Sequence, residues 1–219
     1  MDNVLIENLI DLCAIAMLLL SLLAMSAATM NQLLKAFAIQ SVFLTVLALI
    51  VAVSEGESEL YIMAGITFAV KVVLIPWFLR YTTNHIKTER DVDSSIGIPT
   101  SLILSAVLIM VAYFVTAPIL DSFDTVMRNC LAISLSIVLI GLFMMVTRKR
   151  AMTEAIGLLI MENGLFLGIL SISHGMPLLI ELGIFFDVLM ISVIIGIFAF
   201  RISRTFNSID TSFLRRLKD

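Results

Sequence analysis

The chain has 219 residues, of which 60% are hydrophobic and 14% charged, and its mean hydropathy is +1.10. This composition excludes a soluble globule with one core and indicates a membrane protein with several spans. The formal net charge of −3 gives little guide to partners, because the distribution of charge is informative and its sum is not. Cys13 and Cys130 are too few for a disulfide framework or a metal cage, and no phosphate-loop or Cys/His motif occurs, so we expect no metal, no other cofactor and no nucleic acid partner.

Apolar stretches of about 20 residues, bounded by charged or turn residues, predict an all-α polytopic protein with about seven transmembrane helices. These spans are expected at Leu5 to Met25, Leu33 to Val53, Leu60 to Leu79, Pro99 to Leu120, Met127 to Val146, Met152 to Ser173 and Leu178 to Phe200. The polar segment from Tyr81 to Ile98 is the expected long cytoplasmic loop. We divide the chain into a four-span part, residues 1–120, and a three-span part with a short cytoplasmic tail, residues 121–219.

Basic residues fall almost entirely at one end of these predicted helices. Twelve of the 14 lysines and arginines share that end: Lys35, Arg80, Lys87, Arg90, Arg148, Lys149, Arg150, Arg201, Arg204, Arg215, Arg216 and Lys218. The opposite end holds Arg128 and collects acidic residues such as Glu7, Glu55 and Asp124. The positive-inside rule therefore predicts an external N-terminus and a cytoplasmic C-terminus.

Three ionisable residues lie inside predicted spans, namely Lys71, Glu162 and Asp187. The short linker from His174 to Pro177 makes the last two spans antiparallel neighbours. At 1.5 Å per helical residue, all three side chains lie roughly 15 to 18 Å from the outer face, about half of a 30 Å hydrocarbon core. Inserting a charge at that depth costs about 2.5 to 3.5 kcal/mol or more, so the three residues are predicted to form a proton relay.

Glu162 has two interpretations. In a structural role, a protonated carboxyl would hydrogen-bond to a neighbouring helix, a contact worth about 0.6 to 2 kcal/mol. Asn163 and Gly164 would suit such a close helix–helix contact. As a relay group, its pKa would be shifted in opposite directions by burial and by Lys71, which would let it change state near neutral pH. We favour the relay, because apolar contacts can hold helices together at a lower free-energy cost than a buried acid.

Lys71 must have an acidic partner at mid-membrane or be neutral, and Asp187 is the candidate partner. Five residues later, Pro76 lacks an amide hydrogen, which predicts an unpaired carbonyl at Val72 and a kink just past the lysine. Glu181, His174 and Asn163 are secondary candidates, and the first two lie near the outer turn. Glu181 is expected to reach the headgroup zone, and His174 could pass protons between water and the acids below it.

Two motifs in the last third of the chain, Leu159-Ile160-Met161-Glu162-Asn163-Gly164 and Glu181-Leu182-Gly183-Ile184-Phe185-Phe186-Asp187, resemble the hydrogenase-4 component E family of formate hydrogenlyase-type complexes. The segment from Lys71 to Pro76 fits the same family, so the resemblance covers nearly the whole chain. The last three spans are also similar to the small three-helix subunit of respiratory complex I and of multi-subunit cation/proton antiporters. Those relatives commonly have a glutamate after an Ile-Gly-Leu run, where this chain has Leu159 and then Glu162 one turn deeper.

The resemblance implies a subunit in the cytoplasmic membrane of a bacterium or archaeon, without metal or flavin of its own. It would sit between quinone-site-like and antiporter-like membrane subunits, reach a peripheral redox or hydrogenase arm indirectly, and pass protons or cations along a polar axis at mid-membrane. Two alternatives stay open. One is a passive membrane scaffold, and the other a self-contained secondary transporter, against which the lack of a visible internal repeat weighs.

Overall fold

The computed structural model describes residues 3–56, 58–85, 92, 94–119 and 125–172. Over these residues the chain is helical, which confirms the all-α class. The helices are α1 (Asn3–Ser26), α2 (Met30–Glu55), α3 (Ser58–Thr67), α4 (Ile75–His85), α5 (Ile98–Thr116), α6 (Thr125–Thr147) and α7 (Ala151–Ile172). A π-helical segment, Phe68–Leu74, joins α3 to α4, and a 3₁₀ turn, Ala117–Ile119, follows α5.

Six helical stretches in the described part are long and apolar enough to cross a membrane, with α3, the π segment and α4 forming one of them. Their limits are Leu5–Ser26, Met30–Ser54, Leu60–Tyr81, Ile98–Thr116, Asn129–Thr147 and Ala151–Ser171. The largest difference from the sequence prediction is at the fourth span, which ends at Thr116 instead of Leu120 because the chain tightens there into the 3₁₀ turn. The predicted seventh span, Leu178 to Phe200, lies outside the described residues. The protein is a multi-pass membrane protein.

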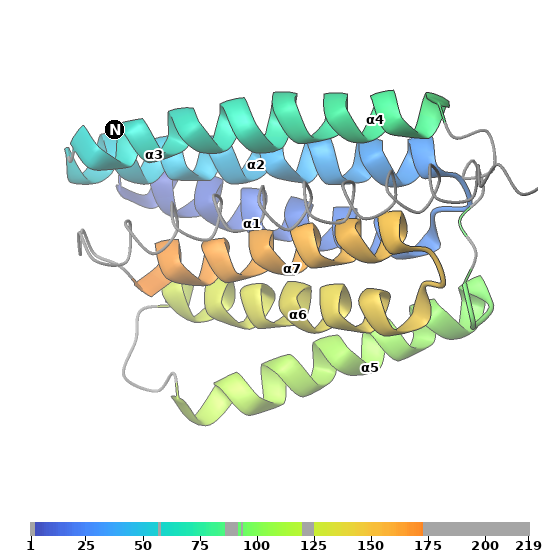
Figure 1. Cartoon of the computed structure of the whole chain (residues 1–219). Helices are drawn as coiled ribbons and strands as arrows, with labels where there is room; N and C mark the ends of the chain where they lie inside the picture. Colours follow the sequence, from blue (N-terminus) through green and yellow to red (C-terminus); the bar gives the residue numbers. More distant parts are fainter. Residues whose placement is uncertain (1–2, 57, 86–91, 93, 120–124, 173–219) are drawn as a thin grey trace, which may run out of the picture.

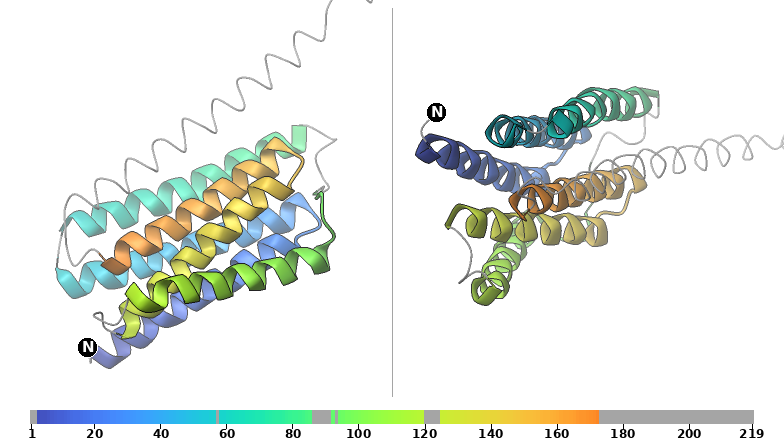
Figure 2. Two further views of the ribbon diagram at one scale, coloured as in Figure 1. Left: turned by 90° about the horizontal axis from the view of Figure 1, so that it is seen from below. Right: turned by 90° about the vertical axis from the view of Figure 1, so that its left-hand side faces the viewer.

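The helices lie side by side, with α7 near the middle (Figures 1 and 2). Helix α7 packs against α6 on one side and α2 on the other, while α5 lies at one edge beside α6 and α4 lies at the opposite edge beside α2. In the 18-residue apolar core of the α7 span, 72% of residues are buried within the protein, against 17% in the corresponding stretch of α5. Side chains on α7 are therefore shielded from lipid by neighbouring helices, whereas most of α5 faces outward.

Helices α6 and α7 approach closely because glycine replaces a side chain where they cross. A Cβ atom at Gly164 of α7 would lie 2.9 Å from the backbone nitrogen of Val138, and one at Gly141 of α6 would lie 2.6 Å from that of Met161. Residues two apart on an α-helix point in different directions, because each residue turns the helix by about 100°. Since Gly164 faces α6, Glu162 faces away from it, toward α2 and the π segment.

The turns at one end of the bundle are joined to each other. Arg148, between α6 and α7, is only 4% exposed and donates from Nη2 to the carbonyl of Met25 at the end of α1, at 2.6 Å. The backbone N–H of Val92 donates to Ala28, and that of Ser95 donates to Thr147. We call this end, which carries Lys35, Arg80, Arg148, Lys149 and Arg150, the basic end. That it faces the cytoplasm stays a prediction of the positive-inside rule.

Candidate functional site

The structure brings two of the predicted relay residues into contact. Lys71 Nζ lies 3.3 Å from Glu162 Oε1, and the two side chains are 0% and 2% exposed. Lys71 is 11 residues after Leu60 and 10 before Tyr81, and Glu162 is 11 after Ala151 and 9 before Ser171, so each lies near the middle of its span. An ion pair thus crosses from the third span to α7 about half-way through the membrane, with no exposure to its surroundings.

The π-helical segment positions Lys71. Within Phe68–Leu74 the turns are wider than in an α-helix, and the N–H of Ile75 donates to the carbonyl of Val70, five residues back. In an α-helix the ring of Pro76 would clash with the carbonyl four residues before it, and a wider turn relieves that clash. The sequence predicted a kink beyond the lysine on its cytoplasmic side. The structure instead places the irregular backbone around Lys71 itself.

Phe166 completes the surroundings of the lysine. The Nζ atom of Lys71 lies over its ring, 5.2 Å from the centroid, in cation–π geometry. Glu162 and Phe166 are four residues apart on α7 and therefore share one face of that helix. The sequence did not predict a role for Phe166, because an aromatic residue in an apolar span is ordinary. Its ring covers the ammonium on one side with a surface that excludes water.

A buried amide network starts at the residue after Glu162. Asn163 Nδ2 donates to Gln40 Oε1 and to Ser41 Oγ of α2, both at 3.2 Å. Gln40 Nε2 donates in turn to Ser21 Oγ at 2.8 Å and to the carbonyl of Met17 at 3.2 Å, both on α1. The network ties α7 to α2 and α1 beside the ion pair. The sequence prediction did not include Gln40, although a carboxamide in the middle of an apolar span indicates a hydrogen bond between helices.

Two more buried polar atoms lie near the pair. Thr67 Oγ1, four residues before Lys71, and Asn163 Oδ1 make no hydrogen bond within the part of the chain that the structure describes. Buried polar groups are nearly always hydrogen-bonded, so such atoms call for an explanation. Each could accept a hydrogen bond from a water molecule.

The other predicted site residues, Asp187, Glu181 and His174, lie outside the described residues. The proposed pairing of Lys71 with Asp187 therefore stays a prediction, and among the described residues Lys71 pairs with Glu162. Asn163, the residue after Glu162, hydrogen-bonds to α2 through the amide network, and its part in the relay stays a prediction. Among the described residues, no three His, Cys, Asp or Glu side chains are grouped as a metal site would require.

Comparison with known proteins adds an independent observation. The chain is 28% identical to the protein Rv0085 of Mycobacterium tuberculosis over the full length of both. It is 26% identical to hydrogenase-4 component E of Escherichia coli strain K12, over 99% of this chain and 98% of that one, and the same holds for Shigella flexneri. The chain is therefore similar to hydrogenase-4 component E over nearly its whole length. No family profile and no solved structure matches it.

Similarity to hydrogenase-4 component E extends from the first helix to the tail, so no part of this chain is an added domain relative to those proteins. Lys71 and Glu162 both fall within the aligned length. The ion pair therefore lies within the part of the chain that aligns with hydrogenase-4 component E.

Proposed function

We propose that this chain is a non-redox membrane subunit of a hydrogenase-4-type complex, in which the Lys71–Glu162 pair carries protons at mid-membrane. The observation that carries the proposal is the 3.3 Å contact between Nζ and Oε1 of two fully buried side chains. Similarity to hydrogenase-4 component E supports the assignment to such a complex. The subunit would also anchor its neighbours in the cytoplasmic membrane.

The cost of burial argues that the pair is more than structural. Removing two charges from water costs several kcal/mol each, and replacing a buried pair with apolar residues is often neutral or stabilising by about 1 to 4 kcal/mol. Two membrane helices can pack without any charge, as α6 and α7 do through Gly141 and Gly164. Because the pair contributes little to the stability of the helix packing, a role in carrying protons explains it best.

The geometry allows a simple proton exchange. A proton that moves from the Lys71 ammonium to the Glu162 carboxylate converts the ion pair into a neutral amine and a carboxylic acid. The acid can release that proton on one side while the amine takes up another, and the net charge of the site stays constant between steps. A hydrogen bond of this type is usually about 2.7 to 3.2 Å long, so the observed distance needs only a small approach.

The partners follow from the same proposal. We infer that the pair joins a longer polar axis through quinone-site-like and antiporter-like subunits and through Asp187, with Glu181 and His174 near its outer entrance. The carried ion is a proton in the proposed reaction, since an amine and a carboxyl exchange one directly. The redox or hydrogenase arm would be reached only through neighbouring subunits.

A passive scaffold is the second candidate, and the amide network favours it. Asn163 and Gln40 join three helices without a titratable group, as a purely structural subunit would require. A secondary transporter would need an alternating binding site within this chain alone. The two described pockets, one between α2 and α4 and one between α1 and α2, are not lined by Lys71 or Glu162.

Substitution of Glu162 with glutamine separates the two functions. The amide keeps the size and hydrogen-bonding capacity of the acid but cannot release a proton, so proton uptake in vesicles with the assembled complex should fall at least about ten-fold. Subunit content, measured by gel densitometry, should stay unchanged. Normal uptake at normal subunit content would reject the relay and support the scaffold.

A further inference from the structure

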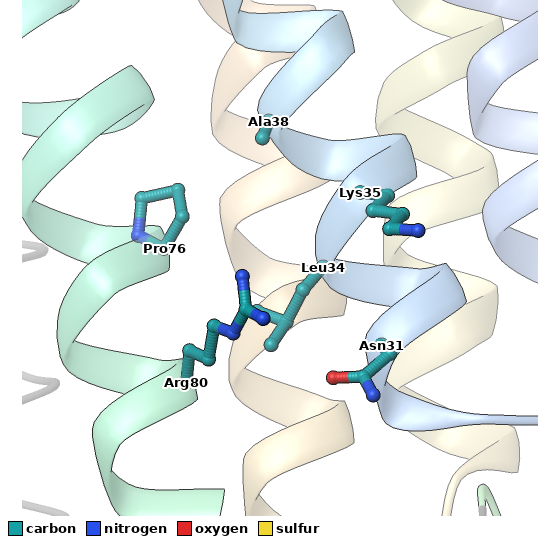
Figure 3. A pocket seen from close by; sticks show the side chains of 6 residues that line it. All are labelled: Asn31, Leu34, Lys35, Ala38, Pro76 and Arg80. Carbon is teal, nitrogen blue, oxygen red and sulfur yellow. The ribbon is translucent and has the colours of Figure 1, made fainter.

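A pocket of about 250 Å³ opens between α2 and α4 at the basic end (Figure 3). Two of its lining residues are cations, Lys35 and Arg80. The other lining residues are Asn31, Leu34, Ala38 and Pro76, so none of the described lining residues is acidic. The pocket lies apart from the ion pair, and the proposed relay does not use it.

Polar and apolar lining residues are separated along the pocket. The guanidinium of Arg80 reaches from α4 toward α2, and the carboxamide of Asn31 points into the same space (Figure 3). Ala38 is seven residues beyond Asn31, about 10 Å deeper in the span. Pro76 is one turn deeper than Arg80 on α4. The pocket is therefore cationic near the end of the bundle and apolar toward the middle of the membrane.

The aromatic residues next to the pocket mark the level of the membrane surface. Trp77 and Tyr81 of α4 stack with their ring centroids 6.1 Å apart, and they are 67% and 55% exposed. Exposed tryptophan and tyrosine are enriched at the boundary between headgroups and hydrocarbon. Arg80 lies between them in sequence, so its guanidinium is at the depth where lipid phosphates occur.

We propose that this pocket binds an anionic phospholipid of the leaflet at the basic end. Arg80 binds the phosphate and Asn31 donates a hydrogen bond to it. Lys35, whose ammonium points away from Arg80 in Figure 3, adds its positive charge at the rim of the pocket, and the start of an acyl chain packs on Leu34, Ala38 and Pro76. The position of Asn31 in the first turn of α2 adds the positive end of a helix dipole. A basic pocket between transmembrane helices with an apolar floor has the chemistry of a lipid headgroup site. A free phosphate would leave that floor unused.

The test uses Trp77, which is the only tryptophan of the chain and therefore a single fluorescent reporter next to the pocket. The full chain is reconstituted in phosphatidylcholine vesicles that contain a small fraction of brominated phosphatidylglycerol or, in a parallel sample, of brominated phosphatidylcholine. Bromine quenches tryptophan only at short range. We expect the anionic lipid to bind more tightly, by roughly five-fold for each cation in the pocket.

The double variant K35Q/R80Q should lose this preference, so that the two brominated lipids quench equally. R80K keeps the charge and should retain most of the preference. K149Q removes an exposed cation at the same end but outside the pocket, and should retain all of the preference. Equal quenching in the unchanged chain, or a preference that survives K35Q/R80Q, would overturn the proposal.

Two further experiments distinguish the lipid from other possible occupants of the pocket. Added glycerol phosphate should leave the excess quenching unchanged, and its loss would show that the pocket takes a soluble phosphate instead. The intact complex, released in mild detergent, should retain phosphatidylglycerol in native mass spectrometry, and the K35Q/R80Q complex should retain less. Equal retention would indicate that an acidic segment of a neighbouring subunit fills the pocket, which also contradicts the proposal.

Discussion

Lys71 lies with its ammonium over the ring of Phe166, with Nζ 5.2 Å from the ring centroid. The carboxylate of Glu162 approaches the same ammonium, at 3.3 Å. One side of the cation thus faces a proton acceptor and another a ring that cannot accept a proton. This asymmetry favours exchange with the acid over exchange with water that enters from the side of the ring.

Substitution of Phe166 with leucine should remove the cation–π contact with Lys71 while keeping the site apolar. A desolvated cation–π contact is worth about 2 kcal/mol, so a double-mutant cycle of F166L with K71M should give a coupling energy of about 1 to 2 kcal/mol. The measurement is thermal unfolding of the purified assembly. The cycle of F143L on α6 with K71M is the control and should be additive. A coupling near zero for Phe166 would mean that the ring only fills space.

Substitution of Lys71 with methionine should leave a buried carboxylate without its cation. Breaking such a pair costs about 3 to 5 kcal/mol, and Glu162 would then stay protonated. We expect lower thermal stability of the assembly and loss of proton uptake in vesicles. The double variant K71M/E162Q removes both charges, so its stability should return while uptake stays lost. Equal stability of K71M and the unchanged protein would contradict an ion pair in the membrane.

Substitution of Asn163 with leucine should break the amide network but leave the relay groups in place. Gln40 Oε1 would lose its donor, and a buried unsatisfied acceptor costs about 1 to 3 kcal/mol. Stability should fall by that amount, while proton uptake per assembled complex stays within about two-fold of normal. S136A is the control, because within the described part of the chain that hydroxyl bonds only a carbonyl of its own helix. A large loss of uptake at full assembly would place Asn163 in the proton path.

Reporter fusions should establish the orientation. A reporter after Asp219 should be cytoplasmic and one before Leu5 external, because 12 of the 14 basic residues fall on one predicted face. The measurement is activity of reporters that work on only one side of the membrane. An external C-terminus would contradict the predicted seventh span, and an inverted pair of results would contradict the positive-inside assignment.

The sequence by itself determined the spans that the structure describes and the depth of their charged residues. In hydrocarbon every backbone polar group must be satisfied within its own helix, so each span is encoded locally by a run of about 20 apolar residues. The fixed rise per residue then places Lys71 and Glu162 near the middle of their spans.

Only the tertiary structure decided which residues meet at that depth. Depth fixes a position along the helix axis, but the neighbour of a side chain also depends on helix rotation and on which helices are adjacent. Those are set by contacts between distant residues, such as the close approach at Gly141 and Gly164 that turns Glu162 away from α6. The contact of Lys71 with Glu162, the ring of Phe166 and the amide of Gln40 all follow from that packing, and no local pattern in the sequence specifies them.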